Sequence, residues 1–363
     1  MKLFGGIASV IIIAIVIGIM VVQVKKRETD VTLQKTVVAM IMNGPRDDHS
    51  WGESHFIAME KVAEKLNLEV IYKENTLEDS TCERVLEEVV GQGAKIVIAN
   101  SFGFGPHVMA VAKKHPEVKF FHATGVENDQ NVSNYFGRIY QMRYLSGLVA
   151  GAMTKTGEIG YVAAFDISEV NRGINAFTLG VQKANPSAKV YVSWSHSWVS
   201  DSLAAEATRR LMDKHKIDVL TVHTDALTAY EIAEQNDIWI VGYNVDNSKR
   251  YPKKFLTAPV WRWENFYEPR ILEVLQDKFA GKSYWLGVES EMIDLAPISS
   301  VVPEEAKILV ESEMKRLRDG SYDVFYGPVY DNQGNVRIDQ DESMTDLDML
   351  NHFDWYVKGV VNE

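Results

Sequence analysis

The chain has 363 residues, of which 46% are hydrophobic, 24% charged and 10% aromatic; these fractions exclude wholesale disorder and collagen, and the length suits about two domains. The formal net charge of −12 argues against a nucleic-acid partner, because an acidic surface without a basic stripe repels a phosphate backbone. A single cysteine, Cys82, excludes an intramolecular disulfide and a cysteine-based zinc site.

The first 27 residues predict a membrane anchor, followed by a polar linker at 28–35. Residues 3–24 carry no charge, and as a helix they would span roughly 33 Å, about the thickness of a bilayer's hydrocarbon core. A secretory signal is the alternative, but the apolar run passes directly into three basic residues at 25–27 without a small-residue cleavage site. An uncleaved anchor is therefore favoured, and the basic flank leans slightly towards a cytoplasmic body.

The rest of the chain predicts an α/β fold with two similar lobes. Continuous β-rich apolar runs, as expected of strands buried on both faces, alternate with segments of helical periodicity. The first series has expected strands at 37–42, 68–72, 95–99 and 119–122, and helices at 50–66, 80–90 and 106–114. The second series has expected strands at 158–162, 189–193, 219–222 and 238–241, and helices at 171–183, 202–215 and 226–235. This alternation implies parallel sheets joined by right-handed crossovers.

The remaining segments are expected to cross back between the lobes and complete both. They are a helix at 264–279, a strand at 289–295 and a helix at 304–317, followed by a hairpin and a closing helix from Tyr322 onwards. The expected domain limits are 36–155 plus 262–295 for the first lobe and 156–261 plus 296–363 for the second.

Polar and aromatic residues gather directly after the predicted strands, at the edge where open parallel sheets bind ligands. Ser50 is a candidate N-cap with Glu53 at the capping-box position, which places Trp51 in the first helical turn. Trp51 is either a platform for a flat ligand or a residue packed beneath its loop, and each acidic residue is either a ligand contact or a helix cap. The candidate ligand-binding residues are Ser50, Trp51, Asn100, Phe102, Asp166, Trp198, Asp225, Asp246, Trp261 and Trp263.

This set of side chains suits a planar, nitrogen-rich heterocycle. Rings that sandwich a base add ~0.5–1.5 kcal/mol per pair beyond area burial, and a carboxylate that accepts an N–H adds about 1.5–3 kcal/mol. Catalysis is not indicated, because Asp48, His49 and Ser50 are merely contiguous and the HExxH, GxSxG and P-loop motifs are missing. We expect no catalytic residue, no metal and no cofactor.

The chain resembles the basic membrane protein family of ABC-transporter substrate-binding proteins, which includes bacterial purine nucleoside receptors. The motifs that carry the resemblance lie at 48–51, 102–104, 144–147, 154–160, 171–177, 240–246, 295–297 and 302–303. The resemblance implies a type I periplasmic-binding-protein fold with two Rossmann-like lobes, three hinge crossings and a ligand enclosed when the lobes close. It also implies that Trp51 stacks on a purine and that Asp246 contacts its sugar or base.

Two departures from the nucleoside receptors favour a free purine base, such as adenine, over a nucleoside. In those receptors a lysine follows a Leu-Thr-Ser-like run, whereas here the corresponding run leads to Trp261. Their Gly-rich loop is replaced by His223, Thr224 and Asp225. Both changes are expected to shrink the sugar pocket.

The resemblance further implies an extracytoplasmic, monomeric, non-enzymatic component that works with an ABC permease and an ATPase. Members of the family are typically lipoproteins, whereas this chain has no cysteine near its amino end, so the apolar segment would have to tether it to the cell membrane. The extracytoplasmic placement conflicts with the basic flank at 25–27. A membrane-anchored purine sensor without a transporter is the alternative, and a nucleoside hydrolase on the same scaffold is a weaker one.

Overall fold

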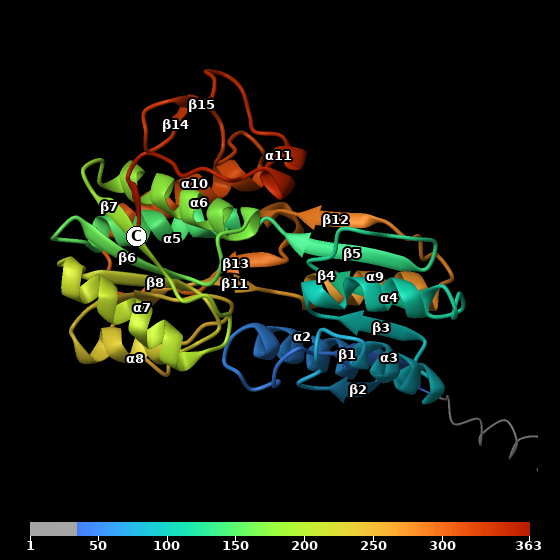
Figure 1. The fold of residues 1–363 in the computed structure, drawn as a ribbon. Helices are drawn as coiled ribbons and strands as arrows, with labels where there is room; N and C mark the ends of the chain where they lie inside the picture. The colour runs from blue at the N-terminus through green and yellow to red at the C-terminus, as the bar shows by residue number, and fades with distance from the viewer. Residues whose placement is uncertain (1–34) are drawn as a thin grey trace, which may run out of the picture.

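Two six-stranded parallel sheets form the centres of two lobes, which lie on either side of Figure 1. The computed structural model describes residues 35–363. The strand order is β12-β5-β4-β3-β1-β2 in lobe I and β10-β9-β8-β6-β7-β16 in lobe II. Every neighbouring pair in both sheets is parallel. The predicted α/β class with parallel sheets is confirmed.

Lobe I contains the described chain up to Gly137 and two later elements, a helix and a strand. Its central strand β1 is apolar and buried from Val38 to Ile41, as the continuous hydrophobic run predicts. The strands are β1 (Val37–Ile41), β2 (Glu69–Lys73), β3 (Ile96–Ala99), β4 (Lys119–Ala123), β5 (Val132–Gly137) and β12 (Ser283–Leu286). The helices are α2 (Trp51–Leu66), α3 (Thr81–Gly91), η1 (Phe102–Phe104), α4 (Gly105–Ala112) and α9 (Glu264–Leu275).

Lobe II repeats this arrangement in the second half of the chain. Its strands are β6 (Glu158–Ala163), β7 (Lys189–Trp194), β8 (Val219–His223), β9 (Trp239–Val241), β10 (Phe255–Thr257) and β16 (Val360–Asn362). The helices are α5 (Tyr140–Met153), α6 (Ser168–Ala184), α7 (Asp201–Lys214), α8 (Thr228–Gln235) and α10 (Glu304–Arg318).

The chain crosses between the lobes three times. The first crossing joins β5 to α5, the second joins β11 (Pro259–Trp261) to α9, and the third leads from β12 through η2 (Val288–Ser290) to β13 (Ile293–Leu295). The antiparallel pair β11-β13 lies between the two sheets in Figure 1. We refer to these three crossings together as the hinge.

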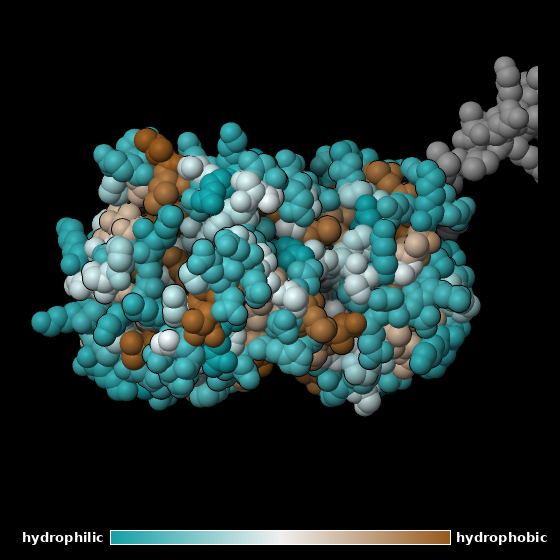
Figure 2. Space-filling model, turned by 90° about the horizontal axis from the view of Figure 1, so that it is seen from above, coloured by the Kyte–Doolittle hydropathy of each residue, from teal (hydrophilic) through white to brown (hydrophobic). Residues whose placement is uncertain are grey.

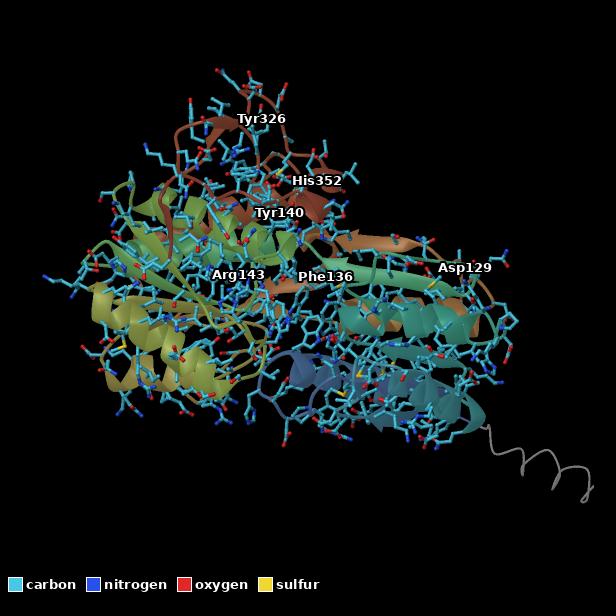
Figure 3. All side chains as sticks on the ribbon, viewed as in Figure 1. Asp129, Phe136, Tyr140, Arg143, Tyr326 and His352 are labelled. Atoms are coloured by element: carbon cyan, nitrogen blue, oxygen red, sulfur yellow. The ribbon has the colours of Figure 1, made fainter. Side chains whose placement is uncertain are left out.

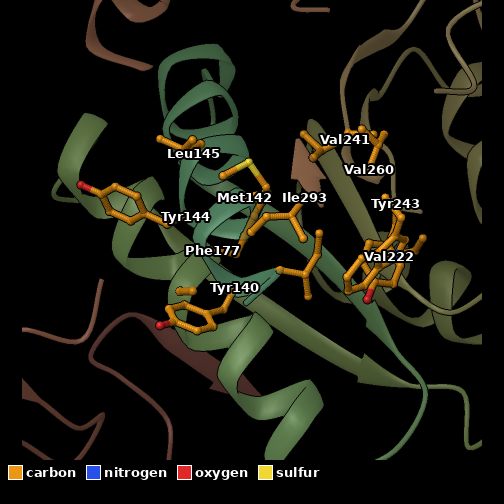
Figure 4. Close-up of a cluster of buried hydrophobic side chains, with 14 of the residues drawn as sticks. Tyr140, Met142, Tyr144, Leu145, Phe177, Val222, Val241, Tyr243, Val260 and Ile293 are labelled. Carbon is orange, nitrogen blue, oxygen red and sulfur yellow. The ribbon is translucent and has the colours of Figure 1, made fainter. Parts of the chain in front are cut away.

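Helix α5 corrects the expected limit of lobe I at 155, because it already belongs to lobe II. It packs closely along α6, and a Cβ at Gly147 would overlap the carbonyl oxygen of Phe177. Figure 4 shows Tyr140, Met142 and Leu145 on this helix, in the buried cluster that also contains Phe177. The first crossing therefore comes directly after Gly137.

The carboxyl-terminal segment lies against α6 of lobe II (Figure 1). It contains the predicted hairpin, formed by β14 (Val329–Tyr330) and β15 (Val336–Ile338), and the predicted helix α11 (Asp346–Asn351). The chain then continues into β16, which the sequence analysis did not predict. Asp346 forms an ion pair with Arg138 at the first crossing, so this segment also contacts the hinge.

The surface in Figure 2 is largely hydrophilic and narrows between two rounded masses. The expected membrane anchor at 1–27 lies outside the described residues, as does the linker at 28–35 except for Lys35. Over residues 35–363, none of the helices has the length and apolar character needed to span a membrane.

Candidate ligand-binding cleft

The loop after β1 presents the amino terminus of α2 to lobe II. The side chain of Asp48 caps this helix: its Oδ1 accepts hydrogen bonds from the backbone N–H groups of Ser50 (2.8 Å) and Glu53 (2.9 Å), and its Oδ2 accepts from that of Gly52 (2.7 Å). The side chain of Ser50 makes no capping bond, and Glu53 contacts His49 instead. The expected capping box is therefore absent, and Asp48 leaves the Ser50 hydroxyl free to point at the other lobe.

Hydrogen bonds join the two lobes at this point. Ser50 Oγ donates to Asp225 Oδ1 at 2.8 Å, and Asn244 Nδ2 lies 2.8 Å from the same Asp225 oxygen and 2.9 Å from Ser50 Oγ. Asn247 Nδ2 donates to the backbone carbonyl of His49 at 3.0 Å. Asp225 follows β8 and the two asparagines follow β9, so the carboxyl ends of lobe II strands meet the helix of lobe I, as open parallel sheets predict.

The carboxyl group of Asp225 has an unusual electrostatic environment. Burial is the main cause that raises its pKa, and the nearby charge of Asp48 raises it further. The hydrogen bonds from Ser50, Trp51 and Asn244 lower it. The resulting pKa is about 7. The same burial also raises the pKa of Asp48. Two carboxyl groups, one from each lobe, thus share one helix terminus.

Trp51 forms part of an aromatic wall close to the hydrogen bonds that join the two lobes. Its Nε1 donates to the backbone carbonyl of Asn100 at 2.9 Å, and its ring lies edge-on to Trp261 and Trp263, at centroid distances of 5.7 and 5.5 Å. Trp261 stacks on Trp263 at 4.3 Å and donates its own N–H to Asn244 Oδ1 at 2.8 Å. Trp51 remains partly exposed, so it combines a packing role with an accessible surface.

Asn100 of lobe I and Thr224 of lobe II each carry a buried polar atom that has no hydrogen-bond partner within residues 35–363. Asn100 accepts a bond from the backbone of Asn43 through Oδ1, but its Nδ2 is unpaired. Thr224, which precedes Asp225, has an unpaired Oγ1. Buried polar atoms are rarely left unpaired, so these two positions suit groups that a ligand would satisfy.

Three expected site residues lie outside this arrangement, and a fourth, Trp263, belongs to the aromatic wall only as a fully buried ring. Phe102 is 64% exposed, and Trp263 is fully buried behind Trp261 with its N–H on Ser54. Asp166 is exposed and accepts bonds from Asn171 and Tyr356.

Asp246 is also exposed, and its carboxylate caps the backbone N–H of Ser248 within its own loop. In that loop Asn244 and Asn247, not Asp246, form hydrogen bonds with lobe I. This placement corrects the expectation that Trp51 and Asp246 converge.

The carboxyl ends of the lobe II strands also carry Trp198, one of the expected site residues, near Phe165 and His223. Trp198 is partly exposed and lies 5.7 Å from the Phe165 ring and 6.2 Å from the His223 ring. His223 Nε2 contacts Glu169 Oε1 at 3.1 Å. Among the described residues, no group of three or more His, Cys, Asp and Glu side chains is placed to hold a metal ion.

The model of the PnrA-like ABC-transporter substrate-binding proteins matches residues 35–323. This chain belongs to that family. Its match spans both lobes and all three crossings, and it ends before β14. The family consists of binding components of transporters.

Individual relatives show what the chain is similar to. A purine-binding protein of Brucella abortus is 33% identical over 329 residues, which are 90% of this chain and 93% of the relative. A candidate ABC-transporter glucose-binding protein of Haloferax volcanii is 32% identical over 297 residues, 82% of this chain and 75% of the relative. The solved structure of a transcriptional activator of the comK gene from Bacillus halodurans shares the fold, with a TM-score of 0.70 at 20% identity, and covers 79% of this chain and 99% of that one.

Proposed function

We propose that this protein is the substrate-binding component of an ABC importer and binds a purine in the cleft between its lobes. The observation that carries the proposal is the convergence of Trp51 and Asn100 from lobe I with Asp225 and Asn244 from lobe II. An accessible indole, unpaired buried polar atoms and carboxyl groups are the recognition elements of a flat heterocycle with ring nitrogens. The purine-binding relative from Brucella abortus supports the same ligand class.

A free base, adenine-like, fits the cleft better than a nucleoside. Where the nucleoside receptors are expected to carry a ribose-contacting lysine, this chain has the stretch that precedes Trp261. The ring of Trp261 is buried, and its N–H donates a hydrogen bond to Asn244. The indole therefore fills space beside the cleft that a sugar would need. A purine nucleoside remains the second ligand within the same class.

Calorimetric titration of the purified full-length chain with adenine, adenosine, guanosine and hypoxanthine tests the ligand. D-glucose is included as a further ligand because the Haloferax volcanii relative is named for glucose. Binding of adenine or another purine supports the proposal. Binding of glucose alone, or of none of these compounds, refutes it.

The body is proposed to lie outside the cytoplasm, tethered to the cell membrane by the apolar segment at 3–24 and acting with a permease and an ATPase. A membrane-anchored purine sensor is the second candidate, because an uncleaved anchor suits a protein that stays at the membrane. Protease accessibility on intact cells separates the two placements: digestion of the body supports the importer, and protection supports a cytoplasmic sensor.

A further inference from the structure

Glu169 occupies the first turn of α6, beside the site already described. Strands β6 and β8 are parallel neighbours, and Ala163 at the end of β6 pairs with His223 at the end of β8. Glu169 follows β6, and Asp225 lies two residues after His223, so both carboxyl groups stand at the same sheet edge. The side chain of Glu169 is 24% exposed, whereas that of His223 beneath it is buried.

His223 fixes the position of the Glu169 carboxylate. Its Nδ1 lies 3.0 Å from the hydroxyl of Tyr161, and its Nε2 lies 3.1 Å from Glu169 Oε1. A carboxylate can only accept, so Nε2 carries the hydrogen and Nδ1 accepts from the tyrosine. Burial, which outweighs the attraction of Glu169, lowers the pKa of His223, and the ring is therefore a neutral donor near pH 7.

Arg143 supplies positive charge behind this pair. Its guanidinium carbon lies 3.6 Å from the centroid of the Tyr243 ring, and its Nη1 donates to the carbonyl of Val222 at 2.9 Å. Nε and Nη2 are buried, and residues 35–363 offer them no partner. Figure 3 labels Arg143 in lobe II and Phe136 in lobe I. A buried cation with unpaired donors favours a negative charge close by.

The pKa values of Glu169 and Asp225, the two carboxyl groups at this sheet edge, are shifted in opposite directions. Burial opposes the ionisation of Glu169, but His223, Arg172 and Arg143 together hold its pKa below the ordinary value. Asp225, by contrast, has a raised pKa, and its Oδ1 is already shared by Ser50 and Asn244. At neutral pH, Glu169 is the stronger acceptor, and a carboxylate has more acceptor sites than His223 uses.

We propose that Glu169 is a specificity-determining residue that accepts hydrogen bonds from the amino group of a purine lying against Trp198, with His223 as its positioning residue. This inference rests on the proposed function. It assigns the amino-bearing edge of the base to lobe II and selects aminopurines over purines without the amino group. The partly exposed Glu169 carboxylate and the Trp198 ring both lie beside His223, with Oε1 3.1 Å from its Nε2 and the indole 6.2 Å from its ring, so an acceptor and an aromatic surface are neighbours of one imidazole.

The test compares two ligand pairs that differ by one amino group: adenine with unsubstituted purine, and guanine with hypoxanthine. In the wild-type chain the amino member of at least one pair is expected to bind about tenfold more tightly or better, as a charge-assisted hydrogen bond allows. Glu169→Gln keeps the shape and a neutral acceptor, and is expected to reduce that preference to about threefold or less. Glu231→Gln, an exposed first-turn residue of α8, is the matched control and should leave the preference unchanged.

The outcomes separate this inference from the proposed function. If the wild-type chain binds purines but Glu169→Gln keeps the full preference, or weakens both members of a pair equally, the role of Glu169 is refuted while the function stands. If the wild-type chain binds none of these four bases and neither adenosine nor guanosine, the proposed function itself fails; if it binds a nucleoside but none of the bases, this inference fails and the proposed function stands. Should Glu169→Gln not fold, Glu169→Asp, which withdraws the charge by one methylene, must also lose most of the preference; an unchanged preference overturns the inference.

Discussion

Replacement of Asp225 by asparagine should abolish a pH dependence of ligand binding that originates in the contact between the lobes. In the closed arrangement the pKa of Asp225 is about 7, because the carboxyl group is buried and faces Asp48, whereas the ordinary value is 3.8. A group whose pKa is raised on closure takes up a proton when the lobes close. Closure is therefore favoured as the pH falls through 7, and this advantage is lost above it.

The magnitude follows from the difference between the two pKa values. It amounts to about three units, or roughly 4 kcal/mol when fully expressed, and to about tenfold tighter binding at pH 6 than at pH 8. Asp225→Asn keeps the size of the side chain and an acceptor for Ser50, but it cannot ionise, so its affinity should be nearly constant over this range. Asp246→Asn is the control, because Asp246 is exposed and contacts only its own loop.

Calorimetric titration with the tightest purine at pH 6, 7 and 8 measures the effect in all three proteins. The wild-type chain and Asp246→Asn should lose affinity together as the pH rises. If Asp225→Asn shows the same loss, or if the wild-type affinity increases with pH, Asp225 does not control closure and the reasoning is refuted.

Three further predictions concern packing and the hinge. Trp51→Ala should weaken purine binding by ~1–3 kcal/mol. It should also lower the free energy of unfolding, because the ring packs in the aromatic wall. Titration and thermal unfolding measure the two effects, and unchanged affinity with reduced stability would show that Trp51 is purely structural. Gly147→Ala should lower the free energy of unfolding in urea by at least about 2 kcal/mol, because the new methyl group would overlap a backbone carbonyl of α6. The control Gly91→Ala should be neutral or stabilising, because the space around Gly91 is open. Equal effects of the two substitutions would contradict this packing. Asp346→Ala should lower the free energy of unfolding by less than about 1 kcal/mol, because its ion pair with Arg138 is partly exposed. The loss should be smaller still in high salt, which screens exposed charges. A loss that does not depend on salt would contradict an exposed ion pair.

The position of the site could be predicted from the sequence because it depends on periodicity and topology. Apolar runs located most of the strands, and parallel sheets bind ligands beyond the carboxyl ends of their strands. Ser50, Trp51 and Asp225 were chosen on that basis; Ser50 and Asp225 are joined by a hydrogen bond, and the role of all three in ligand binding stays a prediction. The same pattern could not show that α5 belongs to lobe II, because only its packing against α6 reveals this, nor that the chain ends in a strand paired with β7.

The sequence could not predict in which direction individual side chains of a loop point. Asp246 and Asn244 are two residues apart in one loop, and the local turn decides that the asparagine faces lobe I and the aspartate faces solvent. For a similar reason Asp48 caps α2 in place of the expected Ser50, because either side chain can cap a helix from its position. Glu169 gave no motif at all, since its place at the site depends on contacts with residues far away in the sequence.

A crystal structure of the chain grown with the tightest-binding purine would show directly where the ligand lies. We expect the ring between the lobes, against Trp51 of lobe I and within reach of the strand ends of lobe II that carry Asp225 and Glu169. A purine bound elsewhere, or one that contacts a single lobe, would contradict this expectation.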